Sequence, residues 1–408
     1  MEEMLQIVKR CRRRSTVSVL HAQYTGSESP PIIRNRMTDR IELRRRRVPV
    51  RIALAALPAL LLGSCAYWAR IDAPPASSAA FDAQVSRAMI AAKIPGLSIA
   101  VVQGKRVFWN RAFGVRVAKS NLPVTADTVF EAASLGKPVF AYAVLRLAAQ
   151  KRIDLDRPLS TYWVYPDIAY DARSLQVTAA MVLSHTSGLE NWRQDSTLRF
   201  AYNPGTAFLY SGEAYLYLQK VVEKITGLST ERFVANEVLN PFGMSRSFFV
   251  WPESMDANFA VGTDGAGNSV PKYKPVMQNV AGGFHTTAVD YARFLVAVMQ
   301  GRGLDANLRK RMMQPNVKIW TDPGKDADYL GWGLGFALQY TPDGGMALWH
   351  WGDNDVFKSY MVAYPARRTA LVYFANSVYG LSILDQIVPA ALGGNYPAFK
   401  WLAYPQVP

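Results

Sequence analysis

The sequence predicts an α+β fold, in which strands from both ends of the folded region join one antiparallel sheet, flanked by helices, with a mainly helical insertion. Three observations lead to this prediction: two β-rich runs at 96–115, three more at 346–376, and long helical segments between them. Strands from both chain ends with helices between them are typical of layered α+β domains. With 408 residues, half of them apolar, the chain is long enough to bury a large core.

The first expected element is a helix that follows a Pro/Ser/Ala-rich linker and places five apolar residues on one face: Phe81, Val85, Ala88, Met89 and Ala92. The run GLSIAVVQGKRVFWNRAFGV (96–115) then divides at Gln103-Gly104-Lys105 into the two strands of a hairpin.

The insertion offers helices at 139–150 and 214–227, the second of them stopped by Gly227. After it, MALWHWG, SYMVAYP and TALVYFAN supply three strands within 346–376. We therefore place the folded domain at 79–395, followed by a C-terminal tail at 396–408.

Residues 1–64 are predicted to be a leader for export. The basic stretch RRRRVPVR (44–51) precedes the apolar run IALAALPALLLGSC (52–65), which is short for a membrane span. Translation starts at Met1 or at Met37; in the second case 1–36 is an extension, and 37–64 contains the basic region and apolar signal segment.

The end of this leader, Leu62-Gly63-Ser64-Cys65, resembles the bacterial lipobox, in which cleavage exposes the cysteine for lipid attachment. The alternatives are a signal peptide cut at the small residues, or an uncleaved anchor, with Cys65 incidental. Lipidation would make 65–78 a linker from the membrane. Because Ala66 is not acidic, we expect an outer-membrane lipoprotein that faces the periplasm.

The net charge of +15 is concentrated in the leader, since 1–51 carry 13 Lys and Arg against 5 Asp and Glu. The rest of the chain has no basic stripe interleaved with aromatic residues. The sequence therefore gives no reason to expect nucleic acid as a partner.

Ser134 and Lys137 stand three residues apart in FEAASLGKPVF (130–140), at the start of a helix expected near Leu135. This spacing places both side chains on one helix face. A serine becomes nucleophilic when a base takes its proton, and a desolvated lysine is neutral often enough to do so. The helix N-terminus supplies N–H groups that stabilise developing negative charge.

The spacing alone is weak evidence, because Ser-x-x-Lys arises about once or twice by chance in a chain of this length. A second copy, Ser269-Val270-Pro271-Lys272, lies in a Gly/Pro-rich loop and serves as a control for coincidence. The alternative interpretation of Lys137 is a lysine whose stem covers apolar surface.

Further motifs follow Ser134 in order: LSHTSGLENW (183–192), NPGTAFLYSGEAYLYLQ (203–219), VAGGFHTTAVDYARFL (280–295), GWGLGFAL (331–338) and WHWGDND (349–355). With these motifs the chain resembles the serine β-lactamase-like hydrolases from about residue 80 to 395. That family includes class C β-lactamases, D,D-carboxypeptidases, D-aminopeptidases and related carboxylesterases. The resemblance implies a β-lactamase/transpeptidase-like fold and an acyl-enzyme reaction.

By this resemblance Ser134 is the acylated nucleophile and Lys137 its partner. Tyr210, which opens Tyr-Ser-Gly, matches the tyrosine that moves protons between nucleophile and leaving group, and a nearby lysine would lower its pKa. Taken alone, Tyr210 also fits a core tyrosine. His350-Trp351-Gly352 matches the third motif, which is Lys-Thr-Gly in lactamases and His-x-Gly in several peptidases and esterases. This match implies substrate binding by His350 and Gly352, and an oxyanion hole formed by the backbone N–H groups of Ser134 and Asp353.

Two departures from the family pattern bear on the substrate. Gly212 stands where the family usually has an asparagine that contacts substrate and steadies the lysine, and Glu213 beside it is either a partner of Lys137 or a surface residue. A histidine at 350 is mostly neutral near pH 7 and donates one hydrogen bond, whereas the lysine of lactamases attracts the carboxylate of penicillins. We therefore expect a poor β-lactamase, in which Trp349, Trp351 and Phe357 add apolar surface suited to an acyl chain.

His185 and His285 are expected to support loops through hydrogen bonds, and unclustered histidines do not form a zinc site. The sequence thus predicts an exported serine hydrolase without a cofactor, which cleaves a small-molecule ester, amide or D-peptide as a carboxylesterase or D-amino-acid peptidase. The alternatives are a weak β-lactamase or penicillin-binding protein, and a catalytically silent relative that binds peptidoglycan-type peptides or a protein.

Overall fold

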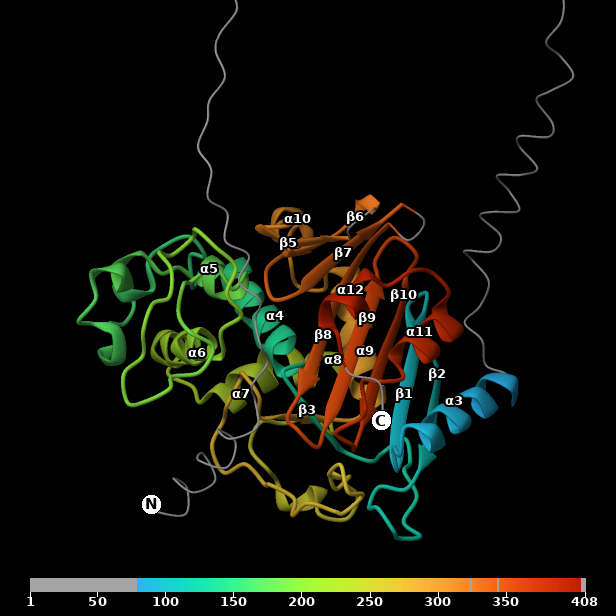
Figure 1. Cartoon of the computed structure of the whole chain (residues 1–408). Helices are drawn as coiled ribbons and strands as arrows, with labels where there is room; N and C mark the ends of the chain where they lie inside the picture. Colours follow the sequence, from blue (N-terminus) through green and yellow to red (C-terminus); the bar gives the residue numbers. More distant parts are fainter. Residues whose placement is uncertain (1–78, 323–324, 343–344, 405–408) are drawn as a thin grey trace, which may run out of the picture. The chain divides into compact units, whose positions relative to one another are not determined.

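An eight-stranded antiparallel sheet forms the centre of the computed structural model, which describes residues 79–322, 325–342 and 345–404 (Figure 1). Its order is β2-β1-β10-β9-β8-β7-β6-β5, and β3 and β4 pair separately. The strands are β1 (Gly96–Gln103), β2 (Arg106–Gly114), β3 (Phe130–Ala133), β4 (Phe284–Thr286), β5 (Val317–Asp322), β6 (Lys325–Trp332), β7 (Ala337–Thr341), β8 (Gly345–Asp353), β9 (Lys358–Tyr364) and β10 (Thr369–Ala375).

The two ends of the folded region meet in this sheet. β1 pairs with β10, with Leu97 opposite Ala375 and Gln103 opposite Thr369. Figure 1 shows the blue-green β1 beside the red β10. The α+β fold predicted from the sequence, with a sheet built from both chain ends, is confirmed.

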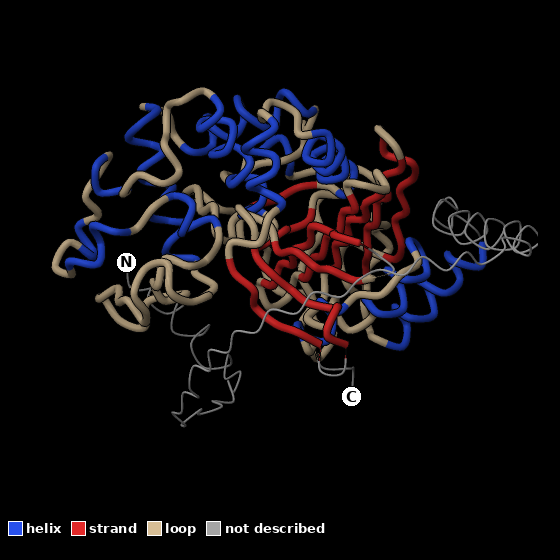
Figure 2. Tube along the Cα trace, turned by 90° about the horizontal axis from the view of Figure 1, so that it is seen from above, coloured by secondary structure: helices blue, strands red, loops and turns tan. Residues whose placement is uncertain are grey.

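Helices cover both faces of the sheet (Figure 2). One buried apolar cluster joins side chains of α3 and α11, such as Val85 and Ile387, to strand residues such as Tyr360. The other joins α4, α6 and α9 to the opposite face. The helices are α3 (Ala79–Ala91), α4 (Gly136–Ala149), α5 (Ala179–Leu183), α6 (Gly212–Thr226), α7 (Thr230–Val234), α8 (Asn240–Phe242), α9 (Ala288–Gln300), α10 (Ala306–Met313), α11 (Leu384–Leu392) and α12 (Pro397–Leu402).

Local sequence explains how the central helices begin and end. The Ser211 hydroxyl accepts the N–H of Ala214 and caps α6, and Gly227 ends that helix at a φ of 69°. Ala133 also has a positive φ, 51°, so the chain turns sharply between β3 and α4. Ser134 sits in that turn.

The leader at 1–64, Cys65 and the linker at 65–78 all lie outside the described residues, so the predictions for them stay predictions. Among the described residues, no helix is both long and apolar enough to span a membrane.

Candidate active site

The Ser134 hydroxyl and the Lys137 ammonium lie together at the start of α4. Lys137 Nζ is 3.1 Å from Ser134 Oγ and donates to the backbone oxygen of Ala281 at 2.5 Å. Ser134 Oγ itself lies 3.3 Å from the same oxygen. The contact expected from the i, i+3 spacing is thus present, and the loop that precedes β4 holds it from the other side.

Lys137 is completely buried among neutral groups. Its ammonium lies 4.7 Å from the centre of the Tyr210 ring and 5.8 Å from that of Tyr215. None of the ion pairs found among the described residues involves it. Burial lowers the pKa of Lys137 from 10.5 to about 7, because a charge without a counter-ion is costly in a site that excludes water. A neutral amine can accept the proton of Ser134.

Tyr210 lies beside this pair, but its ionisation differs from the sequence expectation. Burial raises the pKa of Tyr210 above its ordinary value, and only the neighbouring Ser134 hydroxyl opposes that rise. The predicted lowering by Lys137 is therefore wrong, since desolvation of the phenolate outweighs the attraction of the amine. The Tyr210 hydroxyl oxygen is buried, with no hydrogen-bond partner of ordinary geometry among the described residues. It is a neutral phenol that can give a proton.

His350 on β8 is buried, and its ring centre lies 6.1 Å from that of Tyr210. Burial and, second, the charge of Lys137 lower the pKa of His350 to about 3, so it is neutral as expected. Its Nδ1 lies 2.7 Å from the backbone oxygen of Trp351. Because a carbonyl oxygen only accepts, Nδ1 carries the proton and Nε2 is a lone-pair acceptor. The N–H that was expected to bind substrate instead bonds to the Trp351 backbone oxygen within β8.

Gly352 is required by the close approach of β8 to β3. A Cβ at this position would lie 2.4 Å from the backbone oxygen of Ala132 and 2.2 Å from Ser359 Oγ, distances that no side chain tolerates. The glycine thus brings β8 against the strand that leads to Ser134.

Asp353 ends β8 with a backbone N–H that points away from β9. Asn354 N donates to Phe357 O at 3.1 Å, so the adjacent pair Asp353–Lys358 is of the non-hydrogen-bonded kind. β7 pairs with β8 only as far as Trp349, which leaves this edge of β8 open. The backbone N–H of Asp353 is therefore free to form an oxyanion hole together with the backbone N–H of Ser134.

Gly212 begins α6 beneath the indole of Trp192. A Cβ on Gly212 would lie 2.4 Å from Trp192 Cη2, so the ring occupies the volume of the asparagine side chain expected from the family pattern. Asn191 accepts the N–H groups of Gly212 and Glu213, and Arg193 pairs with Glu213 at 2.8 Å. Glu213 is therefore neither a partner of Lys137 nor a surface residue: its side chain is 6% exposed and anchors the Trp192 loop.

The apolar residues near the third motif divide into two kinds. Trp349 and Phe357 are buried in the core, whereas Trp351 is partly exposed, with its ring centre 5.2 Å from that of Tyr210. Trp351 alone of these three offers apolar surface beside the candidate site.

His185 has a larger part in the site than the sequence suggested. Its Nδ1 accepts the N–H of Ser211 at 3.0 Å, and its ring stacks on Tyr210 with centres 4.2 Å apart. Trp332, from the GWGLGFAL motif, packs edge-on against His185 at 4.8 Å. The loop-supporting hydrogen bond was expected from the sequence, but not that the supported loop carries Tyr210. The order of the motifs was the only signal for it.

Among the described residues, no group of three or more His, Cys, Asp or Glu side chains could hold a metal ion. The groups that the site brings together are the Ser134 hydroxyl, the Lys137 amine, the Tyr210 phenol and the backbone N–H groups.

Comparisons with known proteins place this geometry in context. Residues 81–388 match the family model described as Beta-lactamase. The chain is 22% identical over 304 residues to Protein flp of Staphylococcus aureus (strain N315), which covers 69% of this chain and 60% of that protein. The matched part of the chain thus spans less than two thirds of that relative's length.

Solved structures share the fold at low sequence identity. The octameric penicillin-binding protein homologue from Pyrococcus abyssi aligns with a TM-score of 0.66 and 22% identity, over 80% of this chain and 78% of that one. The D-alanine carboxypeptidase from Burkholderia cenocepacia aligns with a TM-score of 0.63 and 21% identity, over 76% and 96%.

Proposed function

The chain belongs to the beta-lactamase family, as its motifs predicted, and we propose that it is a serine hydrolase that cleaves esters or small amides through an acyl-enzyme on Ser134. One observation carries the proposal: a fully buried Lys137 with neutral partners, 3.1 Å from Ser134 Oγ. A lysine that only covered apolar surface would keep its ammonium in water.

The reaction follows from the protonation states. Neutral Lys137 accepts the proton as Ser134 Oγ attacks the substrate carbonyl, and the N–H groups of Ser134 and Asp353 hold the resulting oxyanion. Tyr210, a phenol, gives its proton to the leaving alcohol or amine and regains one from the Lys137 ammonium. Water then attacks the acyl-enzyme by the same proton transfers in reverse, which releases the acid and restores Ser134.

Two features favour substrates without a carboxylate next to the scissile bond. His350 is neutral and its Nε2 has no proton, so it offers a carboxylate no attraction, where the lactamases have an ammonium. The indole of Trp192, 43% exposed, replaces the amide of the usual asparagine with apolar surface. A neutral ester needs neither polar contact, so carboxylesterase activity fits best and β-lactam turnover worst.

Labelling with a fluorophosphonate probe tests the serine chemistry, because only an activated serine reacts with it. We expect stoichiometric labelling of the wild-type protein at Ser134, located by mass spectrometry. A protein that stays unlabelled would instead be a silent relative that binds peptides or a protein.

The substrate preference is tested by comparing kcat/KM for p-nitrophenyl butyrate and a chromogenic cephalosporin. We expect wild type to prefer the butyrate. His350→Lys with Gly212→Asn should improve the cephalosporin about tenfold or more, because hydrogen bonds to a charged group are strong. This variant must also carry Trp192→Ala, since the new side chain would meet the indole, and Trp192→Ala alone is its control. Wild-type preference for the cephalosporin would contradict the argument.

We also propose that the mature protein starts at Cys65 and is held at the cell envelope by lipid, facing the periplasm. The lipobox-like ending Leu62-Gly63-Ser64-Cys65 supports this proposal. Mass spectrometry of the N-terminal peptide from the native host should find a lipidated Cys65. A free thiol, or a start at another residue, would reject it.

A further inference from the structure

The C-terminal segment lies against the strand that carries the third motif. α12, which is labelled in Figure 1, packs beside β6. Trp401, near the end of α12, contacts side chains of β8. The ring of Trp401 is edge-on to those of Trp349, at 5.8 Å, and Trp351, at 5.3 Å. Trp351 in turn packs on Tyr210. A continuous row of aromatic rings therefore runs from the C-terminal segment to the candidate proton donor.

Tyr404 follows α12 and fixes the side chain of Asp353. Its hydroxyl donates to Asp353 Oδ2 at 2.9 Å, while the Lys358 ammonium pairs with Oδ1. Burial and the adjacent carboxylate raise the pKa of Tyr404, so it stays a hydrogen-bond donor. Both carboxylate oxygens of Asp353 are thus held. These contacts also fix the position of the Asp353 backbone, whose N–H faces the open edge of β8.

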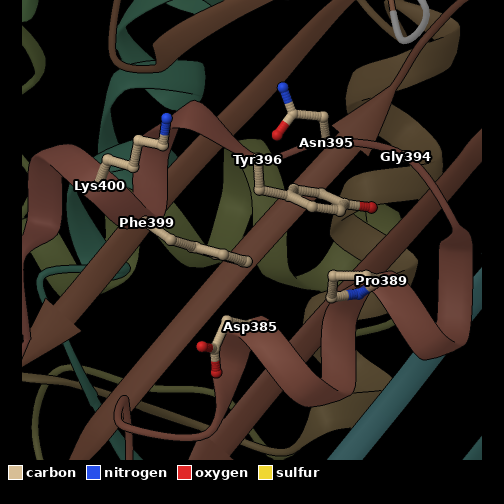
Figure 3. Close-up of a pocket in the computed structure, with 7 residues that line it drawn as sticks. All are labelled: Asp385, Pro389, Gly394, Asn395, Tyr396, Phe399 and Lys400. Atoms are coloured by element: carbon tan, nitrogen blue, oxygen red, sulfur yellow. The ribbon is translucent and has the colours of Figure 1, made fainter. Parts of the chain in front are cut away.

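The other side of the segment has a separate environment. Tyr396 and Phe399 line a cavity of about 350 Å³ between α11 and α12 (Figure 3). Tyr396 bonds to the backbone oxygen of Gly393, and Phe399 packs on Tyr360. Neither ring is in contact with Trp351 or Asp353 in the described aromatic and hydrogen-bond contacts. These two residues are matched controls for Tyr404 and Trp401.

We propose that Trp401 and Tyr404, at the C-terminal end of α12 and just after it, are working parts of the active site. Trp401 supports the Trp351 face that receives the apolar group of the substrate, and Tyr404 is a positioning residue for the Asp353 oxyanion donor. The inference rests on the proposed serine hydrolase function and adds its substrate class: esters whose acyl chain is long enough to reach the Trp351 ring.

The test compares Trp401→Leu and Tyr404→Phe with the controls Phe399→Leu and Tyr396→Phe on p-nitrophenyl acetate and hexanoate. Trp401→Leu should raise KM for hexanoate about tenfold. It should change KM for acetate by less than about twofold, because the acetyl group is too short to reach the Trp351 ring. Tyr404→Phe should lower kcat for both esters about tenfold with KM unchanged, since it weakens an interaction made only in the transition state. Trp401→Phe, which keeps a ring, should fall between wild type and Trp401→Leu.

The outcomes separate this inference from the function on which it depends. If wild type is labelled by the fluorophosphonate and hydrolyses both esters, but the test variants behave like their controls, the C-terminal segment is only structural and the inference is overturned. If wild type is not labelled, the serine hydrolase proposal fails and this inference fails with it. Thermal unfolding of each variant identifies any loss that comes from misfolding.

Discussion

Two segments of the chain carry the same Ser-x-x-Lys spacing, and both lysines are buried, yet their surroundings are opposite. Lys137 touches Ser134 and a backbone oxygen. Lys272 pairs with Glu131 at 3.3 Å and lies 3.0 Å from His285 Nε2, while Ser269 is exposed and shares no hydrogen bond with it among the described residues. The spacing is the same, but only one lysine is left without a carboxylate.

The difference shows what turns a buried lysine into a base. Burial lowers the pKa of both lysines, but the Glu131 carboxylate opposes that lowering at Lys272. Lys272 is therefore half of a buried ion pair, which stabilises a charge. Lys137 has only dipoles around it, so loss of its proton relieves the cost of burial. The missing counter-ion, and not the motif, distinguishes the candidate base.

The largest expected effect separates the two serines. Ser134→Ala should abolish fluorophosphonate labelling, because Ser134 carries the serine hydroxyl that contacts Lys137. Ser269→Ala should be labelled as wild type is, since its hydroxyl has no base. Intact-protein mass spectrometry measures the added probe directly. Labelling lost only in Ser269→Ala would make the loop motif the site and reverse the comparison.

The two lysines should separate activity from stability. Lys137→Met should lower kcat about a hundredfold or more, the usual scale of a general base, without loss of stability. Lys272→Met should keep kcat within about tenfold but lower the free energy of unfolding by about 3 kcal/mol, because Glu131 stays buried without its ammonium. Steady-state rates and chemical denaturation measure the two quantities. Equal losses of activity in both variants would contradict the distinction.

Tyr210 offers a third test, with a smaller expected loss of about a hundredfold in kcat for Tyr210→Phe. The raised pKa means that a phenol, not a phenolate, is the working form. The loss should therefore be greatest for poor leaving groups, such as amides and alkyl esters, and least for p-nitrophenyl esters, whose leaving group needs no proton. The same loss with all leaving groups would exclude Tyr210 as the proton donor.

Much of this site could be predicted from the sequence, because local patterns and motif order carried the information. The β-rich runs between short turns predicted the strands around His350, and the helix start predicted the contact between Ser134 and Lys137. The family resemblance supplied Tyr210, which no periodicity singled out. These features depend on residues near in the chain or on the order of several motifs.

The features that could not be predicted depend on contacts across the fold. Whether Lys137 has a counter-ion depends on which carboxylates the tertiary structure brings near it, and Glu131 lies closer in sequence to Lys137 than to Lys272, its actual partner. The tautomer of His350 depends on the position of one backbone oxygen. The direction of the Tyr210 pKa shift depends on how far the fold excludes water from the phenol. Similarly, nothing local linked Trp192 to Gly212, or Tyr404 to Asp353.

The smallest expected effect, on pH dependence, sharpens the comparison of the lysines further. Because Lys137 has a pKa of about 7, the rate should fall about tenfold per pH unit below 7 and level off above it.

The folded-state pKa of Lys137 is lower than the unfolded value of 10.5, so the unfolded chain binds more protons between about pH 7 and 10.5. Stability therefore rises with pH across that window. Lys137→Met removes this cost, so its melting temperature should exceed that of wild type most at pH 6, by several degrees, and the gain should shrink towards pH 10. Lys272→Met should have a lower melting temperature than wild type at pH 6, because it removes the ion pair with Glu131. A rate that is flat from pH 5 to 9, or a Lys137→Met protein that is less stable than wild type at pH 6, would show that Lys137 is compensated by a charge after all.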